Sequence, residues 1–223
     1  MTQNDQGYAI SEQVFERPDM ACTLEALAKA EMARSKAGAR HVLGVPVVRE
    51  LANDSRLMNI AAQFLGPAPI AFRATLFDKS RASNWLVVWH QDTALPLRRR
   101  VDDAEWGPWS TKAGVLYAHA PARALETVVA LRVHLDDSTA ANGPLRVLPK
   151  THHRGVLSDE QTDQIARHTR AVDCVAAAGG VVAMRPLTVH ASSKSSDANP
   201  RRVLHIEYAT AVNLGSGIEL AVG

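Results

Sequence analysis

Hydrophobic residues recur at helical spacing in the first third of the chain. Residues 23–37 carry one apolar stripe, with Thr23 as a suitable N-cap, and residues 54–65 carry a second stripe that stops at Gly66. The apolar positions are Leu24, Leu27, Ala28 and Ala30 in the first stripe, and Leu57, Ile60, Ala61, Phe64 and Leu65 in the second. The pattern predicts a helical N-terminal part that covers about residues 1–66.

After Pro69 the pattern changes to short apolar or alternating runs, which are typical of β-strands. The expected strands cover residues 70–77, 85–89, 115–117, 127–135, 181–184 and 203–208. One further helix is expected at residues 158–169, with Ser158 as its cap. Helices followed by strands predict an α+β fold whose sheets form a barrel or jelly roll, with a core at about residues 70–210.

Length and composition favour one globular domain. The 223 residues are 46% hydrophobic and 22% charged, a balance that supports a buried core without disulfides. We therefore expect residues 1–223 to form a single domain, with Cys22 and Cys174 reduced. No apolar run is long enough to span a bilayer, and the N-terminus lacks the features of a signal peptide, so we expect a cytoplasmic protein without a membrane partner.

The charge of the chain does not favour nucleic-acid binding. A net charge of +2 and a pI near 8.7 are too mild for a protein that neutralises many phosphates. The run Arg98, Arg99 and Arg100 is locally basic. It fits either a solvated loop or a contact with an anionic substrate.

A histidine and an aspartate two residues apart on a strand project from the same face, because side chains alternate with period two. Such a pair can bind one metal ion, and a distant histidine completes a facial triad that leaves positions open for a cosubstrate and oxygen. The chain contains two such pairs, His90-Gln91-Asp92 and His134-Leu135-Asp136. The spacing alone does not choose between them.

Local context favours the first pair. His90 ends an apolar strand and begins a loop, where sites are usually built, whereas His134 lies within an alternating strand. Farther along, His190 follows an apolar strand, and Arg201 and Arg202 begin the next one. A guanidinium on a neighbouring strand is well placed to hold the far carboxylate of a metal-bound dicarboxylate.

Four blocks of sequence identify a family resemblance. They are W-H-Q-D at residues 89–92, D-D-S-T-A-A-N-G-P-L-R-V-L-P-K-T-H at 136–152, H-A-S-S at 190–193, and P-R-R-V-L-H-I-E-Y at 200–208. In this order the blocks resemble the phytanoyl-CoA dioxygenase family of Fe(II)- and 2-oxoglutarate-dependent oxygenases. The resemblance implies a double-stranded β-helix core of the jelly-roll, cupin-like kind, with the N-terminal helices packed on one sheet.

The resemblance also implies roles for single residues. It assigns the metal to His90, Asp92 and His190, and assigns the anchoring of 2-oxoglutarate to Arg201 rather than Arg202. Strand alternation allows only one of the two arginines to face the site. The hydroxyl that the family often has two residues after the distal histidine is that of Ser192.

Three further positions follow from the same alignment. Arg132 occupies a place where the family often has a tryptophan beside 2-oxoglutarate, so it either contacts the cosubstrate or is an exposed strand residue. Thr75 and Arg73 lie on the face of the preceding strand that looks into the site in the family. The chain has Lys150 where the family frequently has glycine, which leaves the shape of that turn open.

The implied activity is that of a dioxygenase that uses Fe(II), 2-oxoglutarate and O2, hydroxylates a small-molecule substrate, and releases succinate and CO2. Two alternatives stay open: a metal-binding jelly-roll protein without catalysis, and a cupin dioxygenase that needs no cosubstrate. The first is favoured if Arg201 points away from the metal or the pocket is filled, and the second needs no anchoring arginine. Neither the substrate nor the oligomeric state follows from the sequence.

Overall fold

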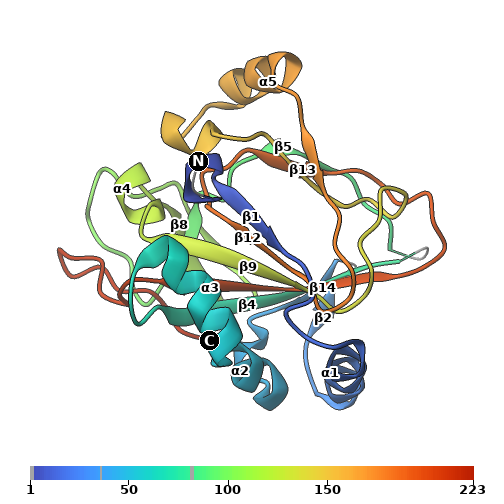
Figure 1. Ribbon diagram of the computed structural model, residues 1–223. Helices are drawn as coiled ribbons and strands as arrows, with labels where there is room; N and C mark the ends of the chain where they lie inside the picture. Colours follow the sequence, from blue (N-terminus) through green and yellow to red (C-terminus); the bar gives the residue numbers. More distant parts are fainter. Residues whose placement is uncertain (1–2, 36, 81–82) are drawn as a thin grey trace.

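The chain folds into three antiparallel sheets with helices at the periphery (Figure 1). The structure is a computed structural model that describes residues 3–35, 37–80 and 83–223. Two of the sheets form the jelly roll, and the third is smaller and lies beside it.

The spatial order of the strands differs from their order along the chain. From one edge to the other, the major sheet consists of β1 (Tyr8–Ser11), β12 (Val181–Met184), β9 (Val128–His134), β14 (Arg201–Ala209), β4 (Ile70–Lys79), β3 (Gly38–Arg40) and β2 (Arg34–Ser35). The minor sheet consists of β11 (Val172–Cys174), β10 (Leu145–Val147), β13 (His190–Ser192) and β5 (Val87–His90). The third sheet consists of β6 (Ala94–Leu97), β8 (Val115–His119) and β7 (Trp109–Lys112).

Helices cover the outer face of the major sheet and one end of the molecule (Figure 1). They are α1 (Arg17–Lys29), α2 (Pro46–Ala52), α3 (Ser55–Leu65), α4 (Ala122–Leu125) and α5 (Asp159–His168), with 3-10 turns at Gln3–Gln6, Val42–Gly44 and Thr151–Arg154. The first three pack on the major sheet, whereas α5 lies at the far end, next to β5 and β13. The expected α+β fold, with a jelly-roll core and N-terminal helices on one sheet, is confirmed.

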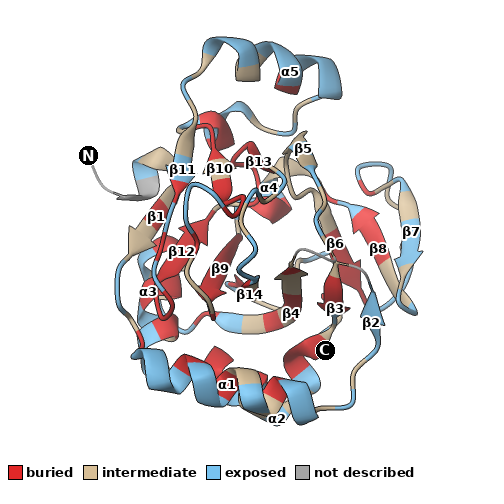
Figure 2. Cartoon of the chain, turned by 90° about the vertical axis from the view of Figure 1, so that its right-hand side faces the viewer, coloured by how far each residue is buried: buried red, intermediate tan, exposed pale blue. Residues whose placement is uncertain are grey.

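The central strands of the major sheet are largely buried (Figure 2), and their two faces differ in chemistry. On β9, Leu131 and Val133 belong to the apolar core beneath the helices, whereas Arg132 and His134 face the interior of the jelly roll. The same alternation on β14 sends Ile206 to the helices. The inner face therefore carries the polar groups that a site needs.

The N-terminal part is less helical than the periodicity predicts. The strands β1, β2 and β3 lie within residues 1–66: β1 forms one edge of the major sheet, and β3 and β2 form the other. The first helix begins at Arg17 rather than near Thr23, whose hydroxyl donates to Asp19 O inside the helix at 2.9 Å. Pro18 is favourable near the start of a helix. The apolar pattern missed this start because Arg17, Pro18 and Asp19 do not belong to an apolar stripe.

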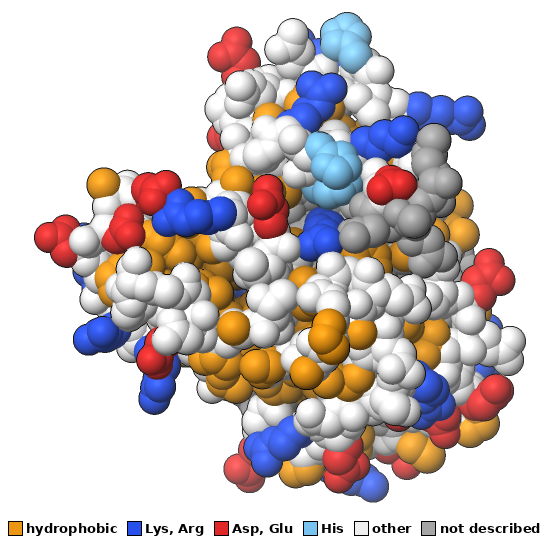
Figure 3. Space-filling view, turned by 60° about the vertical axis from the view of Figure 1, so that its left-hand side comes forward, with side chains coloured by type: hydrophobic (Ala, Val, Ile, Leu, Met, Phe, Trp, Pro, Cys, Tyr) orange, Lys and Arg blue, Asp and Glu red, His pale blue; other side chains and the backbone are white. Residues whose placement is uncertain are grey.

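The other two expected helices are confirmed at α3, capped by Asp54, and α5, capped by Ser158. Among the described residues, no helix is long and apolar enough to cross a membrane. Both cysteines are free thiols. On the face drawn in Figure 3, acidic and basic side chains are interspersed rather than gathered by sign.

Lys150 adopts the backbone conformation that glycine would adopt at this turn, with φ at +68°. We expect Lys150→Gly to raise the free energy of unfolding by about 0.5 to 1 kcal/mol, because a Cβ disfavours this region. Lys150→Ala removes the same side chain but keeps the Cβ, so it should give no such gain. Urea unfolding of both variants measures the difference, and equal effects would contradict the backbone explanation.

Candidate active site

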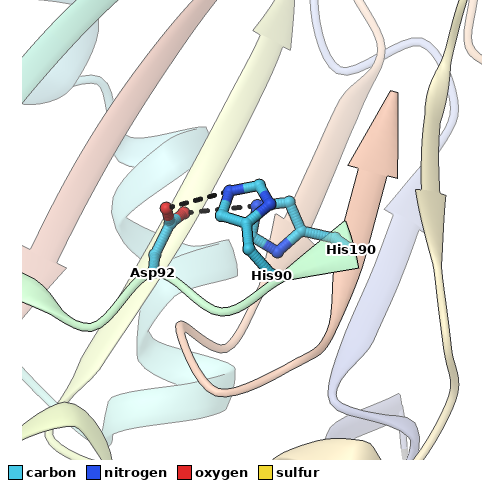
Figure 4. Close-up of side chains that lie close together, drawn as sticks. All are labelled: His90, Asp92 and His190. Carbon is cyan, nitrogen blue, oxygen red and sulfur yellow. Dashed lines mark ion pairs between the residues drawn. The ribbon is translucent and has the colours of Figure 1, made fainter. Parts of the chain in front are cut away.

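The pairing of β5 with β13 brings together two histidines that lie far apart in the sequence. His90, the last residue of β5, is the register partner of His190, the first residue of β13. Asp92 follows in the next loop, and its carboxylate faces both rings (Figure 4). Its Oδ1 lies 3.7 Å from Nε2 of His90, and its Oδ2 lies 3.5 Å from Nε2 of His190. One ligand atom of each residue lies within 4.8 Å of the others, a spacing that suits one metal ion.

Both imidazoles are held in the tautomer that a metal requires. Nδ1 of His90 lies 2.8 Å from Val88 O, and Nδ1 of His190 lies 2.9 Å from Thr188 O. A carbonyl oxygen only accepts hydrogen bonds, so each Nδ1 carries the proton and each Nε2 presents its lone pair toward the carboxylate. Burial lowers the pKa of His190 to about 4, which keeps this ring neutral at neutral pH.

Gln91, between the histidine and the aspartate of the first pair, fixes the loop that carries Asp92. Its Nε2 donates to Gly155 O at 2.9 Å and to Leu187 O at 2.8 Å. Its Oε1 accepts from the N–H of Leu157 at 2.8 Å. The residue between the two expected ligands, to which the sequence analysis assigned no role, thus holds three backbone groups from two other segments.

A cavity of about 340 Å³ opens beside these side chains. All the site residues expected from the sequence line it: His90, Asp92, His190, Arg201, Ser192, Arg132, Thr75 and Arg73. Arg201 is only 3% exposed, whereas Arg202 turns to the other side and donates to Asp136 from Nε at 2.7 Å and from Nη2 at 2.8 Å. The strand alternation thus sends one arginine into the cavity and the other away from it.

Arg201 is a buried cation with an unused donor. Its Nε donates to Asn142 O at 3.2 Å and its Nη2 to Ser192 Oγ at 3.4 Å, while Nη1 has no hydrogen-bond partner among the described residues. Burial, followed by the charge of Arg132, lowers the pKa of Arg201. A buried guanidinium without a carboxylate partner is unfavourable by itself and favours an anion from outside.

Lys79 reaches the same serine from β4. Its Nζ donates to Ser192 Oγ at 2.9 Å, and that hydroxyl donates to Gly143 O at 2.9 Å. Burial, followed by the charges of Arg201 and Arg132, lowers the pKa of Lys79 to about 8. We call Lys79, Arg132 and Arg201 the deep cationic group.

Arg132 and Thr75 are both buried, each with 7% exposure. Nη1 of Arg132 lies 3.1 Å from Nδ1 of His205, and its guanidinium carbon lies 5.3 Å from the centre of the Phe77 ring. The alternative that Arg132 is an exposed strand residue is therefore wrong.

The second histidine and aspartate pair has no part in the cluster of possible metal ligands. Asp136 is held by the backbone and side chain of Arg202. His134 is fully buried, and neither ring nitrogen has a hydrogen-bond partner among the described residues. Burial lowers its pKa to about 3.

Two cations at the cavity were not found by sequence reasoning. They are Arg40 on β3 and Lys112 on β7, both on short strands whose sequence resembles a solvated loop. The run that was considered as an anion contact, residues 98–100, does not line this cavity. Within that run, Arg98 pairs with the carboxylate of Glu219 at 2.8 Å. A solvated loop is the interpretation that fits this run.

Comparisons with known proteins place the chain in a family. The family model for phytanoyl-CoA dioxygenase (PhyH) matches residues 4–203. An L-proline trans-4-hydroxylase from Streptomyces griseoviridis is 27% identical in an alignment 186 residues long that covers 70% of this chain and 60% of the hydroxylase. The chain belongs to the phytanoyl-CoA dioxygenase family, as its motifs indicated, and it spans less than two thirds of the length of this relative.

Solved structures share the fold at low sequence identity. The epimerase SnoN, in complex with Fe3+, α-ketoglutarate and nogalamycin RO, has a TM-score of 0.70 at 20% identity, covering 99% of this chain and 92% of the epimerase. EctD from S. alaskensis in its apo form has a TM-score of 0.70 at 19% identity, covering 93% of this chain and 74% of EctD.

The two histidine and aspartate pairs offer a matched test of the metal centre. We expect Asp92→Asn to weaken Fe(II) binding at least about tenfold, because it removes the negative ligand, whereas Asp136→Asn should leave binding unchanged. Anaerobic calorimetry with Fe(II) measures both. An equal loss in the two variants would contradict the assignment of the metal to the first pair.

Proposed function

We propose that this protein is a non-haem Fe(II)- and 2-oxoglutarate-dependent dioxygenase that hydroxylates a small molecule. The observation that carries the proposal is the position of a metal-ligand cluster and a buried, incompletely paired arginine in one cavity. The family membership and the names of the relatives support it.

The donor set fits Fe(II). His90 and His190 offer neutral Nε2 atoms, and Asp92 offers a carboxylate, which together make the two-histidine, one-carboxylate triad. The pKa of Asp92 lies well below its ordinary value, because the neighbouring histidine rings, His190 first, outweigh the opposing effect of burial, so the carboxylate is ionised.

The deep cationic group fits the far carboxylate of 2-oxoglutarate. Arg201 contributes Nη1, which is buried and has no hydrogen-bond partner among the described residues. Arg132 contributes Nε, which is also buried and has no hydrogen-bond partner among the described residues. Two unsatisfied donors on buried cations favour a dianion over a neutral ligand.

The residues of the chain would bind the metal and the cosubstrate and hold them in position. Arg201 would fix the cosubstrate, the triad would hold the metal, and Gln91 would keep Asp92 in place through its three backbone contacts. Fe(II), 2-oxoglutarate and O2 supply the oxidising chemistry when bound, with succinate and CO2 as co-products. The cavity volume of about 340 Å³ suits a small substrate.

The two rival functions receive less support from this geometry. A non-catalytic barrel was expected to turn the arginine away or to fill the pocket, whereas Arg201 lines an open cavity. A cosubstrate-independent dioxygenase needs no buried cations beside the metal, whereas Arg132 and Arg201 are both buried there. The hydroxylation outcome follows the name of the proline hydroxylase and is part of the proposal.

Arg201 and Arg202 form a matched pair for testing this function. We expect succinate formation from 2-oxoglutarate, with Fe(II), ascorbate and O2, to require about 30-fold more 2-oxoglutarate for half-saturation in Arg201→Met, because a charge-assisted hydrogen-bonding partner is lost. Arg202→Met should keep the wild-type requirement, since this side chain faces Asp136 instead.

Calorimetric binding of 2-oxoglutarate to the metal-loaded protein accompanies this assay, since such enzymes can turn over slowly without substrate. His190→Ala should abolish metal-dependent binding, and thermal melting checks that each variant is folded. A wild-type protein that neither forms succinate nor binds 2-oxoglutarate would refute the proposed function and favour the non-catalytic barrel.

Lys79 predicts a pH dependence of cosubstrate binding. With a pKa of about 8, it is charged below this pH and neutral above it, so the affinity for the 2-oxoglutarate dianion should fall as the pH rises from 7 to 9. Lys79→Met should bind about tenfold more weakly at pH 7 and lose the slope. Calorimetry with Zn(II) as a redox-inert metal measures both, with Lys150→Met as the control. An unchanged slope in Lys79→Met would contradict this role.

A further inference from the structure

The cavity wall holds more positive charge than metal and cosubstrate binding require. Its lysines and arginines are Arg40, Arg73, Lys112, Arg132 and Arg201. Among the described residues that line the cavity, Asp92 alone is acidic, and it belongs to the proposed metal centre. The excess positive charge therefore has no partner on the cavity wall.

The cations fall into two groups. The charges of Arg201 and Arg132 act on Lys79, which defines the deep group. The charges of Arg40 and Arg73 act on Lys112, which defines a second group on β3, β4 and β7 that we call the outer cationic group. The proposed role of the deep group in holding 2-oxoglutarate leaves the outer group unexplained.

Within the outer group, only Arg73 has a carboxylate partner. Its Nε donates to the buried Glu207, and although burial lowers the pKa of Arg73, the negative charge of Glu207 raises it to above its ordinary value. Arg40 and Lys112 make no ion pair among the described residues. Burial, followed by the charges of Arg40 and Arg73, lowers the pKa of Lys112, although the charge of Asp92 acts in the opposite direction.

Strand pairing places Arg40 and Lys112 on the wall of the cavity. Arg40 is the register partner of Thr75, and residues directly opposite one another on antiparallel strands point to the same face, here the cavity face. Lys112 ends β7 at a tight turn in which Ala113 and Gly114 both have positive φ. The Lys112 ammonium lies 5.0 Å from the centre of the Tyr117 ring, which is almost fully buried.

Resting on the proposed function, we infer that Arg40 and Lys112 bind an anionic group of the substrate, a carboxylate or a phosphate, and so select negatively charged substrates. These two cations lie on β3 and β7, whereas the arginines of the deep group lie on β9 and β14, so the substrate anion and 2-oxoglutarate need not compete. Arg73, the third member of the outer group, is already neutralised by Glu207.

The test uses simple anions and neutral compounds of matched shape: benzoate with benzamide, and phenyl phosphate with phenol. Each is titrated calorimetrically into protein loaded with Zn(II) and saturating 2-oxoglutarate, so that Arg201 is occupied. We expect the anion of at least one pair to bind at least about tenfold more tightly than its neutral counterpart. The pair with the larger preference distinguishes a carboxylate substrate from a phosphate substrate.

The double variant Arg40→Gln/Lys112→Gln should lose this preference while keeping its affinity for 2-oxoglutarate. The double variant Lys29→Gln/Arg167→Gln makes the same change in charge at exposed positions outside the cavity, and it should behave as wild type. Thermal melting establishes that both are folded.

Three results would overturn the inference: no anion preference in the wild type, a preference that survives in Arg40→Gln/Lys112→Gln, or a loss of 2-oxoglutarate affinity in that variant. The last result would mean that the two cations serve the cosubstrate or the fold. If the wild type itself does not bind 2-oxoglutarate, the proposed function fails, and the anion titrations without cosubstrate still decide whether Arg40 and Lys112 bind anions.

Discussion

The antiparallel pairing of β5 with β13 is the contact on which the site depends. It sets His90 directly opposite His190, and the backbone ladder thereby fixes the distance between two imidazoles that are remote in the chain. Each ring is then oriented by a carbonyl of its own strand or the turn before it, Val88 O for one and Thr188 O for the other. The proposed metal site thus depends on sheet register, and a slip of either strand by one residue would turn its ring to the wrong face.

The major sheet supplies the cations of the site, because its central strands are covered on both faces. Its outer face is apolar and packs on the helices, which supplies hydrophobic stabilisation. Its inner face carries Arg132, Arg201 and Lys79, whose burial is unfavourable unless anions arrive. The outer face of these strands therefore serves stability, and the inner face serves the proposed ligand binding. The buried cations without carboxylate partners lie on the inner face, where a functional site is expected to depart from ordinary packing.

The sequence predicts the long elements and the motif-based part of the site. The alternation on β4, β9 and β14 is strong because each is long and buried, and it correctly separates Arg201 from Arg202. Strands such as β10 and β13 have only three residues each, too few for an alternating pattern to be recognised. Arg40 and Lys112 could not be found, because two isolated cations on short strands resemble surface charges until β3 pairs with β4 and β7 turns back on β8.

Gln91 connects the site to a part of the molecule that carries no ligand. It joins the loop of Asp92 to the backbone at Gly155 and Leu157, immediately before α5. Beyond those two residues, α5 lies at the periphery, with nearly all of its side chains at least partly exposed. For protein engineering, this divides the segment into two regions: an insertion before Ser158 would act on Asp92 through Gln91, whereas a change within α5 would reach the site through its packing against β5.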